Sequence, residues 1–174
     1  MDRIWSPFNF DAWNVINSSQ PVDPNTYETP SVVMSTAVTP QNASGSVGVS
    51  WTAGGNGEEI PEFYLYLHFA ELEQLNNSQT RELNIYLNNT LWYGPLVPDY
   101  SVTTIYSATG LKGSSLQVMI NRTENSTLPP LLNAFEIYSL KNLSDPETDQ
   151  KDGITCFSKF ALHCSVPQLL LTYL

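Results

Sequence analysis

The chain has 174 residues, of which 41% are hydrophobic and only 14% charged, and its formal net charge is −10. This length suits one domain that buries roughly two-thirds of the surface of its unfolded chain, and the apolar content excludes wholesale disorder. The acidic balance excludes nucleic acid and anionic membrane surfaces as partners, because both require clustered Lys and Arg. Neutral glycans and basic peptides remain open as ligands.

The first thirty residues contain four prolines and show no steady periodicity. Proline interrupts regular elements, since it fixes one backbone angle and lacks an N–H donor. We therefore expect residues 1–30 to form an irregular connector packed on the domain, with one helical turn near Asp11 to Val15.

From residue 31 onward, short runs alternate apolar and polar residues and are separated by turn residues. This period of two is typical of half-buried strands, and no stretch has sustained helical periodicity. Short strands at this spacing predict an all-β domain over residues 31–143, built as an antiparallel two-sheet β-sandwich. The predicted strands cover residues 31–39, 46–51, 62–72, 80–88, 100–108, 115–122 and 131–140.

The composition changes after the last predicted strand. Residues 144–153 are acidic, and the apolar segment 154–174 is interrupted by a lysine, a histidine and a proline. A membrane-spanning helix needs about twenty largely apolar residues, so we expect residues 144–174 to be an acidic linker followed by a weakly ordered tail. The two cysteines, Cys156 and Cys164, both lie in this tail, where they either close a small loop or stay unpaired.

Seven of the fifteen asparagines lie in N-x-S/T sequons, the acceptors of N-linked glycans in extracellular proteins. A secretory signal has a basic segment followed by an apolar one, and "MDRIWSPFNF" does not have this pattern. We therefore expect the chain to be a fragment of a longer secreted or membrane protein. The predicted glycosylation sites are Asn17, Asn42, Asn76, Asn88, Asn121, Asn125 and Asn142.

The strand predicted over residues 62–72 contains the polar groups that could form a catalytic cluster. His68 is the only histidine before the tail, so we expect neither a multi-histidine metal site nor a cofactor. Residues three apart in a strand point to opposite faces, so His68 and Glu71 are not expected to act together. His68 is expected to be half-buried on a sheet face beside two tyrosines. Arg81 is instead a partner for Glu71 across the hairpin, in an ion pair of modest strength if exposed.

Glycoside hydrolysis requires two carboxylates at a suitable separation. Glu71, Glu82 and Glu136 are the candidates, but each lies in a predicted alternating strand, where an outward polar residue needs no catalytic role. We therefore expect no catalytic residue. The alternative function is a secreted β-sandwich glycoside hydrolase or its carbohydrate-binding accessory domain.

An aromatic segment, "LWYGPLVPDY" (91–100), predicts a rigid recognition loop. The flat faces of tyrosine and tryptophan stack on sugars or peptides while their polar edges form hydrogen bonds. We therefore predict that Trp92, Tyr93 and Tyr100 bind a ligand. The competing interpretation is that Trp92 and Tyr93 simply pack against the edge of a hairpin.

Five phrases together resemble the malectin-like extracellular domain of plant leucine-rich-repeat receptor-like protein kinases, and their order and spacing match over about residues 2–150. The resemblance implies a galactose-binding-like jelly roll related to carbohydrate-binding folds, and the second of two tandem modules. The phrases are "DRIWSPFNFDAW" (2–13), "YLYLHFAELEQL" (64–75), "TRELNIYLNN" (80–89), "GPLVPDY" (94–100) and "NSTLPPLLNAFEIYSL" (125–140).

For function, the resemblance implies a non-catalytic recognition module from a receptor-like kinase ectodomain. Such a module would bind a cell-wall glycan or a peptide or protein ligand, with a co-receptor protein as a further partner. It would lie at the extracellular face of the plasma membrane and reach the membrane only through parts of the full-length receptor, which include a kinase domain and leucine-rich repeats. Carbohydrate binding rests here on fold analogy. A further interpretation is a truncated product without independent function, which would expose an apolar patch.

Overall fold

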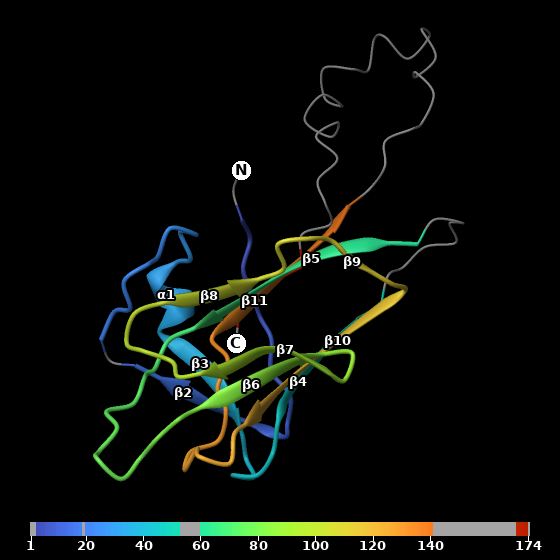
Figure 1. Cartoon of the computed structure of the whole chain (residues 1–174). Helices are drawn as coiled ribbons and strands as arrows, with labels where there is room; N and C mark the ends of the chain where they lie inside the picture. Colours follow the sequence, from blue (N-terminus) through green and yellow to red (C-terminus); the bar gives the residue numbers. More distant parts are fainter. Residues whose placement is uncertain (1–2, 19, 53–59, 141–169, 174) are drawn as a thin grey trace, which may run out of the picture.

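The computed structural model describes residues 3–18, 20–52, 60–140 and 170–173. Most strands belong to two sheets that lie face to face (Figure 1), so the predicted antiparallel two-sheet sandwich is confirmed. The first sheet contains, in spatial order, β1 (Ser6–Pro7), β12 (Leu170–Tyr173), β11 (Ala134–Leu140), β5 (Glu62–Phe69) and β8 (Thr103–Tyr106), with β9 (Leu111–Lys112) also paired to β5. The second sheet contains β4 (Val47–Thr52), β10 (Ser115–Arg122), β6 (Leu83–Leu87) and β7 (Thr90–Leu96).

Alternation along the strands explains the core between the two sheets. In β5 the side chains of Phe63, Leu65 and Leu67 are buried in the core, whereas Tyr64 and Tyr66 on the opposite face are half-buried. The strands β4, β6, β10 and β11 contribute alternate aliphatic residues to the same cluster. Burying one such side chain contributes about 1.5–3 kcal/mol, so a shift of register by one residue would lose most of this core.

Two local predictions about the first forty residues are wrong. Instead of a helical turn near Asp11 to Val15, the chain forms β2 (Trp13–Asn17), which pairs with β3 (Thr36–Pro40). Pairing with β3 provides backbone partners along the whole segment, which one isolated helical turn cannot do. The predicted strand 31–39 begins instead with the single-turn helix α1 (Ser31–Met34).

The reason for α1 lies in its surroundings. The N–H groups of Val33 and Met34 donate to the carbonyl of Pro30, and both side chains are buried. They join a second apolar cluster, on the outer side of the first sheet, with Trp5, Val22, Ala70, Leu72, Val102 and Ala134. The connector is therefore packed on the sandwich in this region, and tertiary packing overrides the local β propensity.

The aromatic segment 91–100 is largely a strand and not a loop. Asn88 and Asn89 have φ values of 46° and 66° and link β6 to β7, as a two-residue hairpin turn requires. Trp92 and Tyr93 consequently lie in β7, and only Tyr100 lies in the following loop. Sequence alone does not predict this strand, because Gly94 and Pro95 interrupt it and its burial does not alternate.

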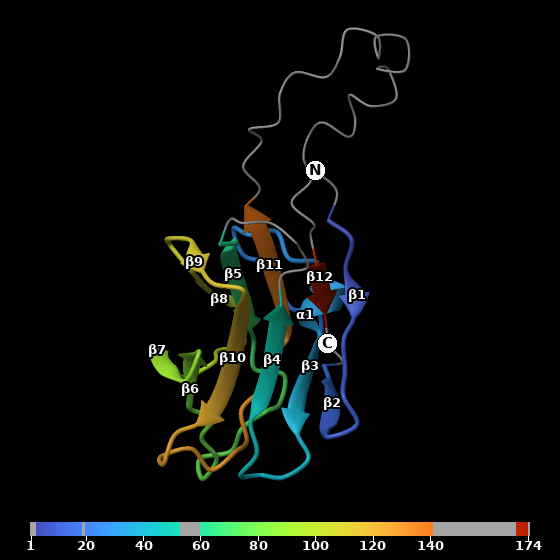
Figure 2. The same cartoon turned by 90° about the vertical axis from the view of Figure 1, so that its right-hand side faces the viewer.

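At the C-terminus, residues 170–173 form β12 although a weakly ordered tail was expected there. β12 pairs antiparallel with β11 and parallel with β1, and Figure 2 shows it between these two strands. The acidic linker 144–153, Cys156, Cys164 and Asn142 lie outside the described residues, so the predictions made for them stay predictions. In the part of the chain that is described, no helix combines the length and apolarity needed to cross a bilayer.

Candidate functional site

Glu71 and Arg81 form an ion pair that is almost completely buried. β5 ends at Phe69, so Glu71 lies in the following loop, where strand alternation no longer decides the direction of a side chain. Arg81 Nε donates to Glu71 Oε2 at 2.9 Å, and the two side chains are 1% and 3% exposed. The pair predicted from the sequence is confirmed, and because it is buried, the modest strength of an exposed ion pair does not apply to it.

The same arginine organises the loop that contains its partner. Its guanidinium also donates to Glu73 Oε2 at 2.5 Å and to the carbonyl of Pro129 at 3.1 Å. The second oxygen of Glu71 accepts the backbone N–H groups of Leu72 and Glu73, each at 3.1 Å. Both oxygens of Glu71 are therefore engaged, and a network this complete holds the backbone of residues 71–73 in one conformation.

His68 belongs to a separate network with Glu136. Its Nε2 lies 2.9 Å from Glu136 Oε1, and its Nδ1 lies 2.9 Å from Thr104 Oγ1. Arg3 donates to the same Glu136 oxygen at 3.1 Å, while the hydroxyl of Tyr138 donates to the other. Burial by itself would raise the pKa of Glu136, but the hydrogen bonds from His68 and Tyr138 and the charge of Arg3 bring this pKa below its ordinary value.

The connector explains why His68 is fully buried rather than half-buried as expected. The rings of Trp5 and Tyr27 lie 6.2 and 6.4 Å from the imidazole, both in edge-on geometry. Arg3 is anchored over the same end of the sheet by the carbonyls of Tyr27 and Glu28, at 2.5 and 2.7 Å. Strand alternation placed His68 correctly on the outer face of β5, but it could not predict that a distant segment covers this face.

The three candidate carboxylates are not outward groups facing solvent. Glu71 and Glu136 are buried, and Glu82 is half-buried and accepts the hydroxyl of Thr123 at 2.5 Å. A glycosidase pair must reach a substrate and hold a proton or a free oxygen for it. The oxygens of Glu71 and Glu136 are instead engaged by arginines, a histidine, a tyrosine and backbone amides. No group of three or more potential metal ligands occurs within the described residues.

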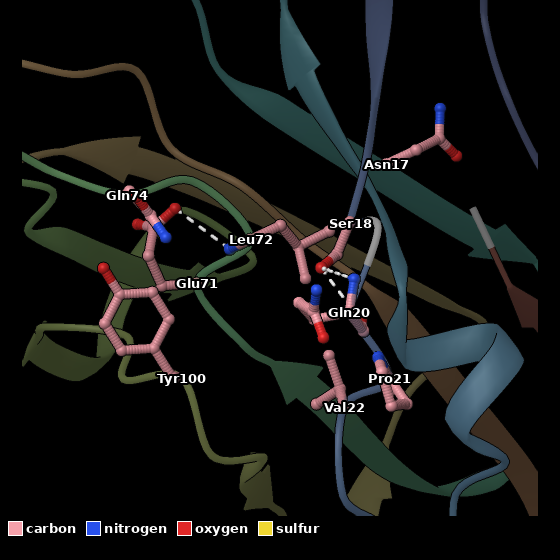
Figure 3. A pocket seen from close by; sticks show the side chains of 9 residues that line it. All are labelled: Asn17, Ser18, Gln20, Pro21, Val22, Glu71, Leu72, Gln74 and Tyr100. Carbon is pink, nitrogen blue, oxygen red and sulfur yellow. Dashed lines mark hydrogen bonds between the residues drawn. The ribbon is translucent and has the colours of Figure 1, made fainter.

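A cavity of about 310 Å³ lies beside the Glu71 loop (Figure 3). One wall is the segment that follows β2, and the other consists of the loop after β5 together with one tyrosine from the loop after β7. Its lining residues are Asn17, Ser18, Gln20, Pro21, Val22, Glu71, Leu72, Gln74 and Tyr100.

Hydrogen bonds fix both walls of this cavity. The Ser18 hydroxyl accepts the N–H of Gln20 at 3.1 Å and donates to its carbonyl at 2.9 Å. On the opposite wall, the Glu71 N–H donates to the carbonyl of Asp99 at 2.8 Å, and the Tyr100 hydroxyl donates to the carbonyl of Glu73 at 3.3 Å. The ring of Tyr100 is thus held at the rim while 57% of the residue stays exposed.

The lining offers a specific set of interactions. The amide side chains of Gln20 and Gln74 can both donate and accept hydrogen bonds, one aromatic ring can stack, and Val22 and Leu72 supply apolar contact. Glu71 contributes to the wall, but its oxygens are already occupied. The cavity is therefore suited to a neutral ligand that has both hydrogen-bonding groups and a flat apolar face.

The structure divides the three predicted ligand-binding residues. Tyr100 lines the cavity, whereas Trp92 packs partly buried against the main core and Tyr93 is 43% exposed on β7 of the second sheet. Sequence reasoning missed Gln20 and Gln74, because isolated amides in two distant loops leave no pattern. Ligand binding by any of these residues stays a prediction.

The sequons that the structure describes differ in accessibility. Asn17, Asn42, Asn76, Asn88 and Asn125 are exposed. Asn121 is half-buried in β10, and its amide oxygen is buried with no hydrogen-bond partner among the described residues. Glycosylation therefore stays a prediction for all of them, with Asn121 the least accessible acceptor.

Residues 1–140 match the family model described as the malectin-like domain. The chain belongs to the malectin-like domain family. It is 38% identical over 156 residues to the LRR receptor-like serine/threonine-protein kinase IOS1 of Arabidopsis thaliana, and 34% identical over 154 residues to the probable LRR receptor-like kinase MEE39 of the same plant. These matches cover 87% and 86% of this malectin-like chain but only 17% of each relative.

Solved structures agree with the fold. The ectodomain of ANX2 from Arabidopsis thaliana superposes with a TM-score of 0.55 at 17% identity, covering 78% of this chain and 42% of that one. A complex of the plant peptide RALF23 with FER and LLG2 gives a TM-score of 0.57 at 18% identity, covering 79% and 41%. At this identity the similarity shows a shared malectin-like fold and nothing more specific.

Proposed function

We propose that this malectin-like domain is a non-catalytic, extracellular recognition module of a receptor-like kinase ectodomain, located at the outer face of the plasma membrane. Its ligand site is the cavity at Tyr100, and the ligand class that fits the cavity best is a neutral glycan segment of the cell wall. The observation behind the ligand class is the lining itself: one fixed aromatic ring and the amide side chains of Gln20 and Gln74 beside a carboxylate whose oxygens are engaged.

The charge of the chain supports this choice. With a formal net charge of −10, the chain repels acidic polysaccharides, whereas a neutral sugar has no such penalty. Sugar hydroxyls both donate and accept, as amide side chains do, and the apolar face of a sugar ring stacks on tyrosine. The volume of about 310 Å³ lies at the lower end of the range for ligand sites, which favours a short glycan segment.

The non-catalytic part of the proposal rests on the carboxylates. Glu71 is held by Arg81, and Glu136 by His68, Arg3 and Tyr138. Neither is placed to donate a proton to a glycosidic oxygen, so the secreted glycoside hydrolase is the weaker candidate.

A peptide ligand is the second candidate for the module, and a co-receptor protein is a further candidate partner. The structure of RALF23 with FER and LLG2 favours it, since FER has this fold and occurs there with a peptide and a further protein. A peptide in the cavity would use the same amides for its backbone groups, so the two ligand classes must be separated by experiment.

Binding of the full chain to arrays of neutral cell-wall oligosaccharides and of peptides tests the proposal. We expect the chain to bind a neutral oligosaccharide. The affinity should fall about tenfold in Tyr100→Ala, because stacking on one ring contributes on the order of 1 kcal/mol and the ring also shapes the rim of the cavity. Tyr93→Ala is the matched control, since it removes an exposed tyrosine that is not among the lining residues. Loss in Tyr93→Ala but not in Tyr100→Ala would place the ligand on β7 and refute the cavity.

A further inference from the structure

A group of tyrosines lies on the outer face of the first sheet, away from the core, and none of them lines the cavity. Tyr64 and Tyr66 come from β5, Tyr106 from β8 and Tyr138 from β11, and Tyr27 of the connector packs beside them. We call these five residues the tyrosine face. Four are half-buried, while Tyr106 is 47% exposed.

Four of the five rings contact one another. Tyr66 and Tyr106 lie opposite each other in the pairing of β5 with β8, and their rings stack at 5.7 Å with an angle of 15°. Tyr138 meets Tyr66 edge-on at 5.6 Å, and Tyr27 lies 5.8 Å from Tyr66 and 5.9 Å from Tyr106. Aromatic residues gathered and partly exposed in this way are enriched in protein interfaces, because they bring large contact area at little entropic cost.

Carboxylates border the tyrosine face on both sides. Glu62 Oε1 accepts the hydroxyl of Tyr64 at 3.3 Å, and this hydrogen bond raises the pKa of Tyr64, so the ring stays neutral. Glu62 is held close to the backbone of Gly110, where an added Cβ would lie 1.7 Å from the same oxygen. At the other side the Tyr138 hydroxyl donates to Glu136.

The chain already places one cation in these surroundings. The guanidinium carbon of Arg3 lies 5.8 Å from the centre of the Trp5 ring, and the same group donates to Glu136 and to the carbonyl of Tyr27. Arg3 therefore combines stacking on an aromatic ring, an ion pair and backbone acceptors at one end of the tyrosine face. The remaining rings and Glu62 likewise combine aromatic faces with a carboxylate. Among the described residues, no arginine stacks on these rings.

The sequons within the described residues start from elements other than those that carry the tyrosine face. None of the six sequons in the described residues lies in β5, β8, β9 or β11. A glycan attached at any of them would start from another element, so the tyrosine face would stay accessible to a macromolecule in a glycosylated protein.

We propose that the tyrosine face docks a basic peptide segment, with an arginine or lysine side chain lying over the rings of Tyr66 and Tyr106 and directed toward Glu62. Cations are attracted to the faces of electron-rich rings, and a formal net charge of −10 draws basic partners toward the whole molecule. This surface shares no residue with the cavity lining, so the proposal does not depend on a glycan binding there.

A hexa-arginine peptide, titrated into the full chain and followed by isothermal calorimetry, tests the proposal, with the neutral isosteric hexa-citrulline peptide as its counterpart. We expect binding of the arginine peptide, a rise of about two- to fivefold in Kd for Tyr106→Ala, and no change for Tyr106→Phe, which keeps the ring. Tyr93→Ala is the matched control, because it removes an equally exposed tyrosine from the other sheet and leaves the net charge unchanged.

Equal effects of Tyr106→Ala and Tyr93→Ala would show that the peptide responds only to the overall charge and would overturn the proposal. So would equal binding of the arginine and citrulline peptides, or no binding of either. Binding of a neutral oligosaccharide that is lost in Tyr106→Ala would assign the surface to glycans instead. Tyr100→Ala separates the two sites, since it changes binding in the cavity and leaves the arginine peptide unaffected.

Discussion

Glu71 and Gln74 lie three residues apart in one loop and line the same cavity, yet their surroundings differ completely. Glu71 is 4% exposed with both oxygens engaged, whereas Gln74 is exposed and lines the cavity without a charge (Figure 3). Removing the partner of Glu71 leaves an uncompensated buried charge. Removing the exposed side chain of Gln74 changes only what the surface can bind. A charged residue beside a cavity is therefore no evidence of catalysis until its hydrogen-bond partners are known.

The largest effect is expected from Arg81→Met. This change leaves Glu71 buried without its cation and frees Glu73 and the carbonyl of Pro129. We expect a loss of about 3–5 kcal/mol in the free energy of unfolding, measured by chemical denaturation. The exposed Arg122 provides the control, and Arg122→Met should stay within about 0.5 kcal/mol of the wild type. A loss below about 1 kcal/mol for Arg81→Met would mean that the ion pair contributes no more to stability than an exposed pair does.

A smaller effect, which depends on pH, is expected from Glu136→Gln. The pKa of Glu136 is lowered in the folded chain, so its ionised form stabilises the fold fully above its unfolded pKa of about 4.3. This contribution is lost as the pH falls through the lowered folded pKa.

We therefore expect Glu136→Gln to cost about 1.5–3 kcal/mol at pH 7 and to flatten the loss of stability between pH 5 and 3. Thermal unfolding followed across this range by circular dichroism measures both. Parallel pH profiles for the wild type and the variant would show that Glu136 does not contribute to the loss of stability in acid.

The smallest effect on stability is expected from Tyr100→Ala, the variant that should weaken ligand binding. Tyr100 is exposed and makes one long hydrogen bond to the loop after β5, so its loss should change the free energy of unfolding by no more than about 0.5 kcal/mol. A larger loss would place this residue with the buried networks and would undermine its assignment to the rim.

Strand alternation was sufficient to predict the two-sheet sandwich and the inward residues of β5, because burial between sheets imposes a period of two. It could not predict that Trp5 and Tyr27 cover His68, since this contact joins segments far apart in the sequence. The hydrogen bonds of Asn133 could not be predicted for the same reason. Its side chain accepts the N–H of Ala70 and donates to two carbonyls near α1, which are also far away in the sequence.

The candidate site was harder to predict than the fold. The aromatic composition of segment 91–100 indicates Tyr100 as a binding residue. It indicates Trp92 and Tyr93 equally, because composition does not distinguish a loop from the strand β7 that forms there. Gln20 and Gln74 meet only through the folded chain, and no local pattern marks them. Periodicity predicts which side chains are buried between sheets, whereas a surface cavity depends on how connecting segments lie against each other.

The central claim is that the charged residues of the loop after β5 hold the fold together, and a double-mutant cycle on Glu71 and Arg81 tests it most directly. The free energies of unfolding of Glu71→Gln, Arg81→Met and the double variant give the coupling between the two side chains. A coupling of about 2 kcal/mol or more agrees with a buried pair that acts as scaffold. A coupling below about 0.5 kcal/mol, the range of exposed ion pairs, would contradict it.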